Sequence, residues 1–218
     1  MLFDLFIIGR EDGCLIDCAG DQRESLAQKL SIYRLRAKVQ IEPEDTQVAA
    51  AWGGEPGPDW IADPRLPALG WRGYGAAPPV GGKPVDRRAY KTHRLELGVP
   101  DTEDWGSDKT YPIEANFDLL DGIDFRKGCF VGQETTSRMK RRGTIKNRMA
   151  PIEFVGPAPD QGTELLSGEL RAGVVLSGTD GRAMALLRLD RLDAGELRTA
   201  DGRAWRVTWP EWLKDSPV

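Results

Sequence analysis

The segment FRKGCFVGQE, residues 125–134, places one cysteine between two glycines and follows the second glycine with a Gln–Glu pair. This pattern predicts a loop that leads into a helix beginning near Val131. Unpaired backbone amides at a helix start favour negative charge. Because Lys127 also lies two residues before Cys129, the pattern indicates a thiol that ionises easily and could serve as a nucleophile or a soft-metal ligand. Plain burial of the thiol is the alternative interpretation.

The residues around this cysteine could hold a ligand. Gly128 and Gly132 would let a ligand approach the backbone closely, since glycine carries no Cβ. The side chains of Gln133 and Glu134 could then orient that ligand. We therefore treat the whole segment as a candidate site.

Charge is distributed unevenly around this segment. Residues 95–125 carry nine acids and one base, whereas residues 126–148 carry eight bases and one acid, in a chain of net charge −4. The helix after the cysteine has only a thin apolar stripe, which favours a solvated helix. Its bases either balance the acidic stretch before them or form a wall that binds a polycarboxylate or a phosphate, with Arg138 as the first member.

Hydropathy and turn residues divide the chain of 218 residues into three units of an α+β protein. Residues 1–84 predict an α+β unit of partial ferredoxin-like type, residues 85–146 a helical segment that carries the cysteine, and residues 147–218 an antiparallel β-barrel. Helices are expected after a capping box of Asp21 and Glu24, after Asp86, and from Pro112 to Gly122. The expected strands are residues 2–8, 14–18, 36–41, 47–52, 69–74, 152–155, 170–177, 183–189 and 205–209.

Composition excludes several classes of function. One histidine, His93, excludes zinc sites that need two or three histidines from one chain, and we expect a packed, hydrogen-bonded imidazole and no metal site. Three cysteines favour reduced thiols over a disulfide framework. No apolar run approaches the roughly 20 residues of a membrane span, and the first residues do not form a signal peptide. The sequence thus predicts a cytoplasmic protein without a membrane partner.

The segment KGCFVGQE, residues 127–134, together with Arg138 and the following bases, resembles the KGC(Y/F)xGQE signature of the YgfZ family of folate-binding proteins. This family is related to the glycine-cleavage T-protein. Three further segments resemble the family, namely RLELGVP (94–100), PIEAN (112–116) and GRAMALLRLD (181–190). The resemblance implies a T-protein-like ring of several domains with a C-terminal antiparallel β-barrel, which binds tetrahydrofolate in a central funnel.

The resemblance also implies a function in the assembly or repair of iron–sulfur enzymes, with folate and client iron–sulfur proteins as partners. An accessory factor is then expected rather than an enzyme. In this picture Cys129 is the key thiol and Lys127 tunes it. The implied folate-binding residues are Glu114, Gly128, Gly132, Gln133, Glu134 and Arg138, with Arg138 facing the anionic folate and Glu114 the pterin ring. Whether Cys129 ligates a cluster, reacts covalently or shapes the pocket stays open.

Two alternatives and one departure accompany the resemblance. The first alternative is a folate-dependent aminomethyltransferase, although the T-protein relatives generally lack the cysteine of the signature. The second is a nucleic-acid-binding module that uses residues 138–148, which the acidic remainder of the chain disfavours. Family members usually have several tens of residues before the position of Met1, so an incomplete N-terminal unit is expected.

Overall fold

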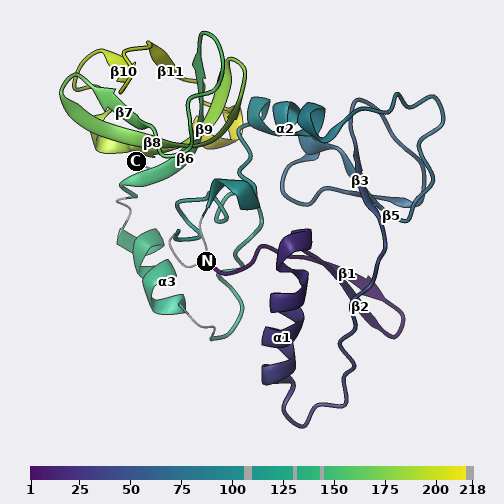
Figure 1. The fold of residues 1–218 in the computed structure, drawn as a ribbon. Helices are drawn as coiled ribbons and strands as arrows, with labels where there is room; N and C mark the ends of the chain where they lie inside the picture. The colour runs from purple at the N-terminus through teal and green to yellow at the C-terminus, as the bar shows by residue number, and fades with distance from the viewer. Residues whose placement is uncertain (106–109, 130–131, 143–144, 215–218) are drawn as a thin grey trace.

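The structure is a computed structural model, which describes residues 1–105, 110–129, 132–142 and 145–214. Figure 1 shows an α+β unit on one side, a β-barrel on the other, and a stretch of turns between them. The chain starts beside these turns, where the Met1 amino group donates a hydrogen bond to the Thr110 carbonyl at 2.8 Å. No helix among the described ranges is long and apolar enough to cross a membrane.

The N-terminal unit combines a hairpin, one helix and a small sheet. Strands β1 and β2 overlap the strands expected at residues 2–8 and 14–18, and they pair antiparallel with Phe6 opposite Asp17. The second sheet has the order β3-β5-β4, and the short strand β4 was not predicted. Its elements are β1 (Phe6–Arg10), β2 (Gly13–Asp17), η1 (Gly20–Gln22), α1 (Arg23–Arg34), β3 (Val48–Ala51), β4 (Trp60–Ala62), η2 (Pro67–Leu69) and β5 (Trp71–Tyr74).

Two predictions for this unit are wrong. Residues 36–41 form no strand, because no neighbouring strand pairs with them. The capping box is not formed either: Asp21 lies within η1, and Gln22 stands at the cap of α1 without a side-chain hydrogen bond. The 3₁₀ turn therefore replaces the predicted cap.

Helix α2 (Arg87–Glu96) follows its sequence signals closely. The Asp86 carboxylate accepts a hydrogen bond from the Ala89 amide at 2.9 Å, which is the predicted N-cap. Gly98 ends the helix with a φ of +70°. His93 stacks on Trp52 at 4.8 Å between ring centroids and its Nε2 lies 3.1 Å from the Ala68 carbonyl oxygen. The packed, hydrogen-bonded histidine is therefore confirmed.

The predicted helix from Pro112 to Gly122 is wrong, since these residues form a succession of turns. Asn116 and Asp121 adopt left-handed φ angles of 62° and 55°, which no α-helix of L-residues can contain. The turns close on themselves through backbone bonds, including one from the Phe117 amide to the Pro112 carbonyl at 3.0 Å. We call residues 112–122 the turn segment.

The C-terminal unit is an antiparallel β-barrel, which confirms the predicted fold class. Its six strands have the order β10-β7-β8-β9-β6-β11, and a bridge between Arg198 and Ala204 joins the two ends of the sheet. Strands β7 and β10 are short and were not predicted. The elements from residue 133 onward are α3 (Gln133–Arg142), β6 (Asn147–Phe154), β7 (Glu164–Ser167), β8 (Leu170–Thr179), β9 (Arg182–Arg188), η4 (Leu189–Arg191), β10 (Leu197–Thr199), β11 (Trp205–Val207) and α4 (Glu211–Lys214).

Strand β6 is buried on both faces and joins the barrel to the rest of the chain. Ala150, Ile152 and Phe154 belong to the barrel core. Met149 instead packs with Leu95 of α2 in a second core cluster outside the barrel. Apolar packing thus fixes the barrel against α2 and the turn segment.

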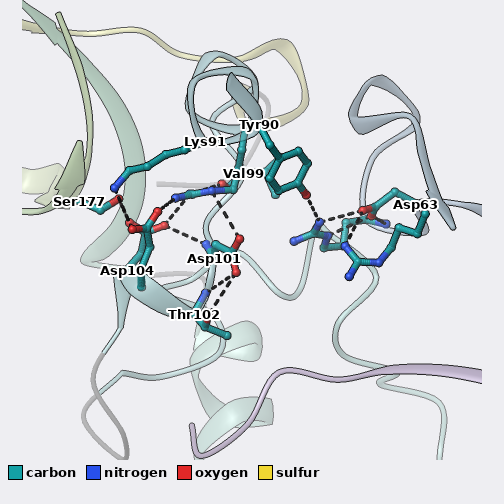
Figure 2. Close-up of polar contacts among 12 residues, drawn as sticks. Asp63, Tyr90, Lys91, Val99, Asp101, Thr102, Asp104 and Ser177 are labelled. Carbon is teal, nitrogen blue, oxygen red and sulfur yellow. Dashed lines mark hydrogen bonds and ion pairs between the residues drawn. The ribbon is translucent and has the colours of Figure 1, made fainter. Parts of the chain in front are cut away.

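A buried ionic cluster reinforces this junction (Figure 2). Arg94 of α2 donates a hydrogen bond to Asp104 at 2.6 Å and another to the Val99 carbonyl at 2.9 Å. Asp104 lies at the end of η3 (Thr102–Asp104) and also accepts a hydrogen bond from Ser177 of β8. We call Arg94, Asp101, Glu103, Asp104 and Ser177 the Arg94 cluster.

Candidate functional site

A cavity of about 400 Å³ lies where the hairpin, the three-stranded sheet and the turn segment meet. Its volume lies within the range of small-molecule sites. The apolar lining includes Phe6, Ile8, Ile61, Phe117 and Leu120, and the polar lining includes Asp4, Arg65, Arg72, Tyr74 and Asp121. We call it the central cavity.

Two guanidinium groups lie against the Phe6 ring at one wall of this cavity. The Cζ atoms of Arg72 and Arg65 are 4.1 Å and 4.9 Å from the ring centroid. Such cation–π contacts stabilise each pair by about 0.5–2 kcal/mol. The aromatic ring and the two positive charges therefore form one wall.

Arg65 is held by a bidentate pair with Asp63 (Figure 2). Its Nε and Nη2 lie 3.0 Å and 2.8 Å from the two carboxylate oxygens, and Nη2 also donates to the Tyr90 hydroxyl at 3.1 Å. Burial alone lowers the pKa of Arg65, but the hydrogen bond and charge of Asp63 outweigh burial and raise the pKa overall. The guanidinium is thus fixed in position and stays charged.

Arg72 is held in a similar way by Asp17 and Tyr74. Its Nη2 pairs with the Asp17 carboxylate, while its Nε donates to the Tyr74 hydroxyl at 3.1 Å. The Tyr74 hydroxyl in turn donates to Asp17 at 3.0 Å. Burial raises the pKa of Tyr74 to about 12, so the phenol stays protonated at neutral pH. This network connects strand β2 to strand β5.

Both arginines keep one amino group for a ligand. Within the described part of the chain, neither the Nη1 of Arg65 nor the Nη1 of Arg72 has a hydrogen-bond acceptor; the nearest ion-pair contact of Arg72 Nη1 is Asp63 at 3.8 Å. A guanidinium with a free amino group binds carboxylate or carbonyl oxygens well. This wall can therefore accept an oxygen-bearing group.

Asp4 lies in the same cavity and has a perturbed carboxyl group. Burial raises the pKa of Asp4, and the charges of Arg65 and Arg72 only partly oppose this rise. A half-buried carboxyl in an apolar cavity can accept hydrogen bonds from an amino-pyrimidine edge. Perturbed acids of this kind concentrate at functional sites.

Glu114, the predicted contact for a pterin ring, lies outside the lining of the central cavity. Its Oε1 accepts a hydrogen bond from Asn147 at 2.9 Å, and its Oε2 accepts one from the Tyr111 amide at 3.2 Å. The side chain is 8% exposed. Both carboxylate oxygens thus connect the turn segment to its surroundings.

The described residues of the cysteine segment, 125–129 and 132–134, are exposed or half-buried, and none of them lines the central cavity. Cys129 is exposed and precedes α3 by four residues, and Lys127 and Gly128 are exposed beside it. In α3 the side chain of Gln133 is half-buried, whereas Glu134 and Arg138 are exposed, and Gly132 before the helix has a φ of +85°. Phe130 and Val131 lie outside the described residues. The roles given to this segment stay predictions.

No three His, Cys, Asp or Glu side chains of the described residues are grouped so as to hold a metal ion. The exposed thiol of Cys129 is not among the residues that line the central cavity, so the thiol and the cavity are separate candidate sites.

Sequence reasoning missed the residues of the central cavity. Asp4, Phe6, Arg65 and Arg72 come from separate elements, so no local spacing connects them. One signal was available: Arg72 is a charged residue in the middle of a short apolar strand, WRGY. Such a residue needs a buried partner or a ligand.

Comparison with known proteins supports the barrel assignment. Residues 146–215 match the family described as CAF17, C-terminal beta-barrel domain. The expected C-terminal barrel thus has both a structural and a family match.

The chain is also similar to iron–sulfur cluster assembly factors. It is 29% identical to "Iron-sulfur cluster assembly factor IBA57, mitochondrial" of Homo sapiens, over 97% of this chain and 68% of that protein. It is 34% identical to the IBA57 homolog of Mycosarcoma maydis, over 71% of this chain and 43% of that protein. It is 32% identical to the IBA57 homolog of Neurospora crassa, over 67% of this chain and 39% of that protein. The chain thus spans about two thirds of the human relative and less than half of each fungal one.

These relatives correct one expectation from the sequence. Each of the three proteins is named as mitochondrial. Their names point to mitochondria rather than the cytosol, so the expectation of a cytoplasmic protein is wrong.

Proposed function

We propose that this chain binds a reduced folate in the central cavity and assists the assembly or repair of iron–sulfur enzymes. The names of the relatives support the iron–sulfur part of the proposal. The resemblance of KGCFVGQE to the YgfZ signature supports the folate part. The observation that carries the folate part is the chemistry of the central cavity.

Each portion of a folate has a counterpart in that cavity. The flat pterin and aminobenzoyl rings suit aromatic walls such as Phe6 and Phe117. The amino-pyrimidine edge offers two adjacent N–H donors, which the Asp4 carboxyl can accept. The glutamate carboxylates suit the Nη1 groups of Arg65 and Arg72, for which the described residues provide no hydrogen-bond acceptor.

Cys129 serves a different step under this proposal. Its thiol is exposed and lies outside the cavity lining, so a large partner can reach it while folate is bound. Client iron–sulfur proteins are the proposed partners. The proposal makes the chain an accessory factor, because the thiol and the folate need not react with each other.

Calorimetry tests the folate part. We expect the wild-type chain to bind 5-formyltetrahydrofolate, and Asp4→Asn to weaken binding by about tenfold or more, since it replaces one acceptor oxygen with an amide NH2 group that can only donate. Asp12→Asn, in the exposed turn of the hairpin, is the matched control and should bind like wild type. No binding by the wild-type chain would refute this part.

Complementation tests the iron–sulfur part. The chain should restore the activity of iron–sulfur enzymes in a strain that lacks its own assembly factor of this type. Enzyme activities that stay at the level of the empty vector, with the protein present in the cell extract, would refute a function in cluster assembly.

A further inference from the structure

Arg148 of β6 is a buried barrel residue whose guanidinium binds residues outside the barrel. Its side chain is 2% exposed and lies on the same face of β6 as Ala150 and Ile152, two residues of the barrel core. The guanidinium contacts the turn segment, which provides one wall of the central cavity. One side chain thus connects the barrel to that wall.

Five hydrogen bonds define this connection, four from Arg148 and one from Asn116. Nη1 and Nη2 each lie 2.9 Å from one carboxylate oxygen of Asp118, which makes a bidentate pair. Nη1 also donates to the Asn116 side-chain oxygen and to the Ile113 carbonyl, both at 3.0 Å. The Asn116 amide group returns a hydrogen bond to the Met149 carbonyl at 2.8 Å. The contacts therefore hold a residue with a left-handed φ, Asn116, directly to β6.

The residues held in this way alternate with residues that line the cavity. Asn116 and Asp118 bind Arg148, and Ala115 and Phe117 beside them line the central cavity. A segment of turns has no continuous helical hydrogen bonding of its own, so its shape depends on such outside contacts. A guanidinium fork fixes a carboxylate in both distance and angle, which an ammonium group does not.

From this geometry we infer that Arg148 is a positioning residue that sets the cavity wall formed by Ala115 and Phe117 and thereby the affinity for folate. The inference rests on the proposed function, because it assigns to Arg148 an effect on the same binding site. Arg148 does not touch the ligand; it acts through Asn116 and Asp118.

Arg148→Lys tests the inference, because it keeps the charge and removes the fork. We expect the Kd for 5-formyltetrahydrofolate to rise about tenfold, as the wall loses its bidentate anchor. We also expect amide hydrogen exchange to become about tenfold faster in the turn segment, including the Phe117 and Leu120 amides, while exchange in β8 and β9 stays as in the wild type. A second variant, Asp118→Asn, keeps the shape of the side chain that pairs with Arg148 but removes its charge. It should also raise the Kd and speed up hydrogen exchange in the turn segment.

Arg182→Lys is the matched control. Arg182 is a barrel arginine of β9 that pairs with Glu153 and Glu96, which do not line the central cavity. The Arg182→Lys variant should have the same Kd for 5-formyltetrahydrofolate and the same hydrogen exchange in the turn segment as the wild type.

Two results would overturn the inference. The first is a folded Arg148→Lys protein whose Kd and turn-segment exchange stay within about twofold of wild type. The second is faster exchange spread equally over the turn segment and the barrel, which indicates loss of stability rather than of position. If the wild-type chain binds no folate, the proposed function fails, and hydrogen exchange alone still decides whether Arg148 positions the wall.

Discussion

Replacing Arg94 with methionine should destabilise the protein strongly. The Arg94 side chain is 1% exposed and pairs with Asp104, which is 0% exposed, at 2.6 Å. Methionine occupies a similar elongated volume but leaves the Asp104 carboxylate buried without its cation. Breaking a buried ion pair by removing one partner costs about 3–5 kcal/mol of the free energy of unfolding.

The free energy of unfolding lost in Arg94→Met should be larger at neutral than at acidic pH. Burial raises the pKa of Asp104 above its ordinary value of 3.8, although Arg94 opposes the rise. The folded protein therefore holds this proton more tightly than the unfolded chain, and the contribution of Asp104 to stability falls as the pH rises through and above 3.8. Without Arg94 the pKa rises further. As the pH falls, a larger fraction of the carboxyl is then protonated, so the substitution costs less at acidic than at neutral pH.

Urea unfolding followed by circular dichroism, at about pH 7 and about pH 5, measures both effects. In a thermal melt at neutral pH the melting temperature of Arg94→Met should fall by roughly 10 °C, since about 1 kcal/mol corresponds to 2–4 °C in a chain of this size. Arg206→Met is the control: Arg206 pairs with Glu153 but is 79% exposed, so it should cost about 1 kcal/mol or less. A loss for Arg94→Met no larger than that of the control, or equal at the two pH values, would refute the reasoning.

Three further predictions concern the candidate site. Cys129→Ser should abolish rescue of a strain that lacks its assembly factor, because serine is neither a soft ligand nor a thiolate nucleophile; full rescue would remove Cys129 from the mechanism. Gly122→Ala should weaken binding of 5-formyltetrahydrofolate about tenfold in calorimetry, because the added Cβ would lie 2.2 Å from a ring carbon of Phe117; Gly54→Ala, which meets no atom within 4 Å, should bind like wild type. Since the raised pKa of Tyr74 lies at about 12, the free energy of unfolding should fall as the pH rises from 10 towards 12, and Tyr74→Phe should lose this slope; an unchanged slope in that variant contradicts the argument.

Sequence patterns located most regular elements, because these depend on local signals. Asp86 predicted the start of α2, which the structure places at Arg87. The strand expected at residues 205–209 contains the whole of β11. Such signals require only neighbours in the chain, so the C-terminal barrel was predictable before its strand order was known.

The turn segment was not predictable, because it depends on contacts from elsewhere. Its apolar spacing from Pro112 to Gly122 fits a helix equally well. What prevents the helix is the anchoring of Asn116 and Asp118 to Arg148, a residue 30 positions after Asp118. Tertiary hydrogen bonds override a weak local preference of this kind.

The candidate site was predictable only in part, for the same reason. The cysteine segment is contiguous in sequence, so its residues could be named before the structure. The central cavity depends on the meeting of Phe6, Arg72 and Phe117, which lie in three different parts of the chain. No spacing in the sequence brings these side chains together.

The burial of β6 on both faces has a consequence for expressing the barrel as a separate fragment. The family match begins at residue 146, which invites expression of the barrel by itself. Met149 and Met184, 1% and 0% exposed in the intact protein, would then lose Leu95 and Trp105 as packing partners. An excised barrel would expose an apolar patch on its outer surface and would be prone to aggregate. The first residue of the family match is therefore a poor place to cut the chain.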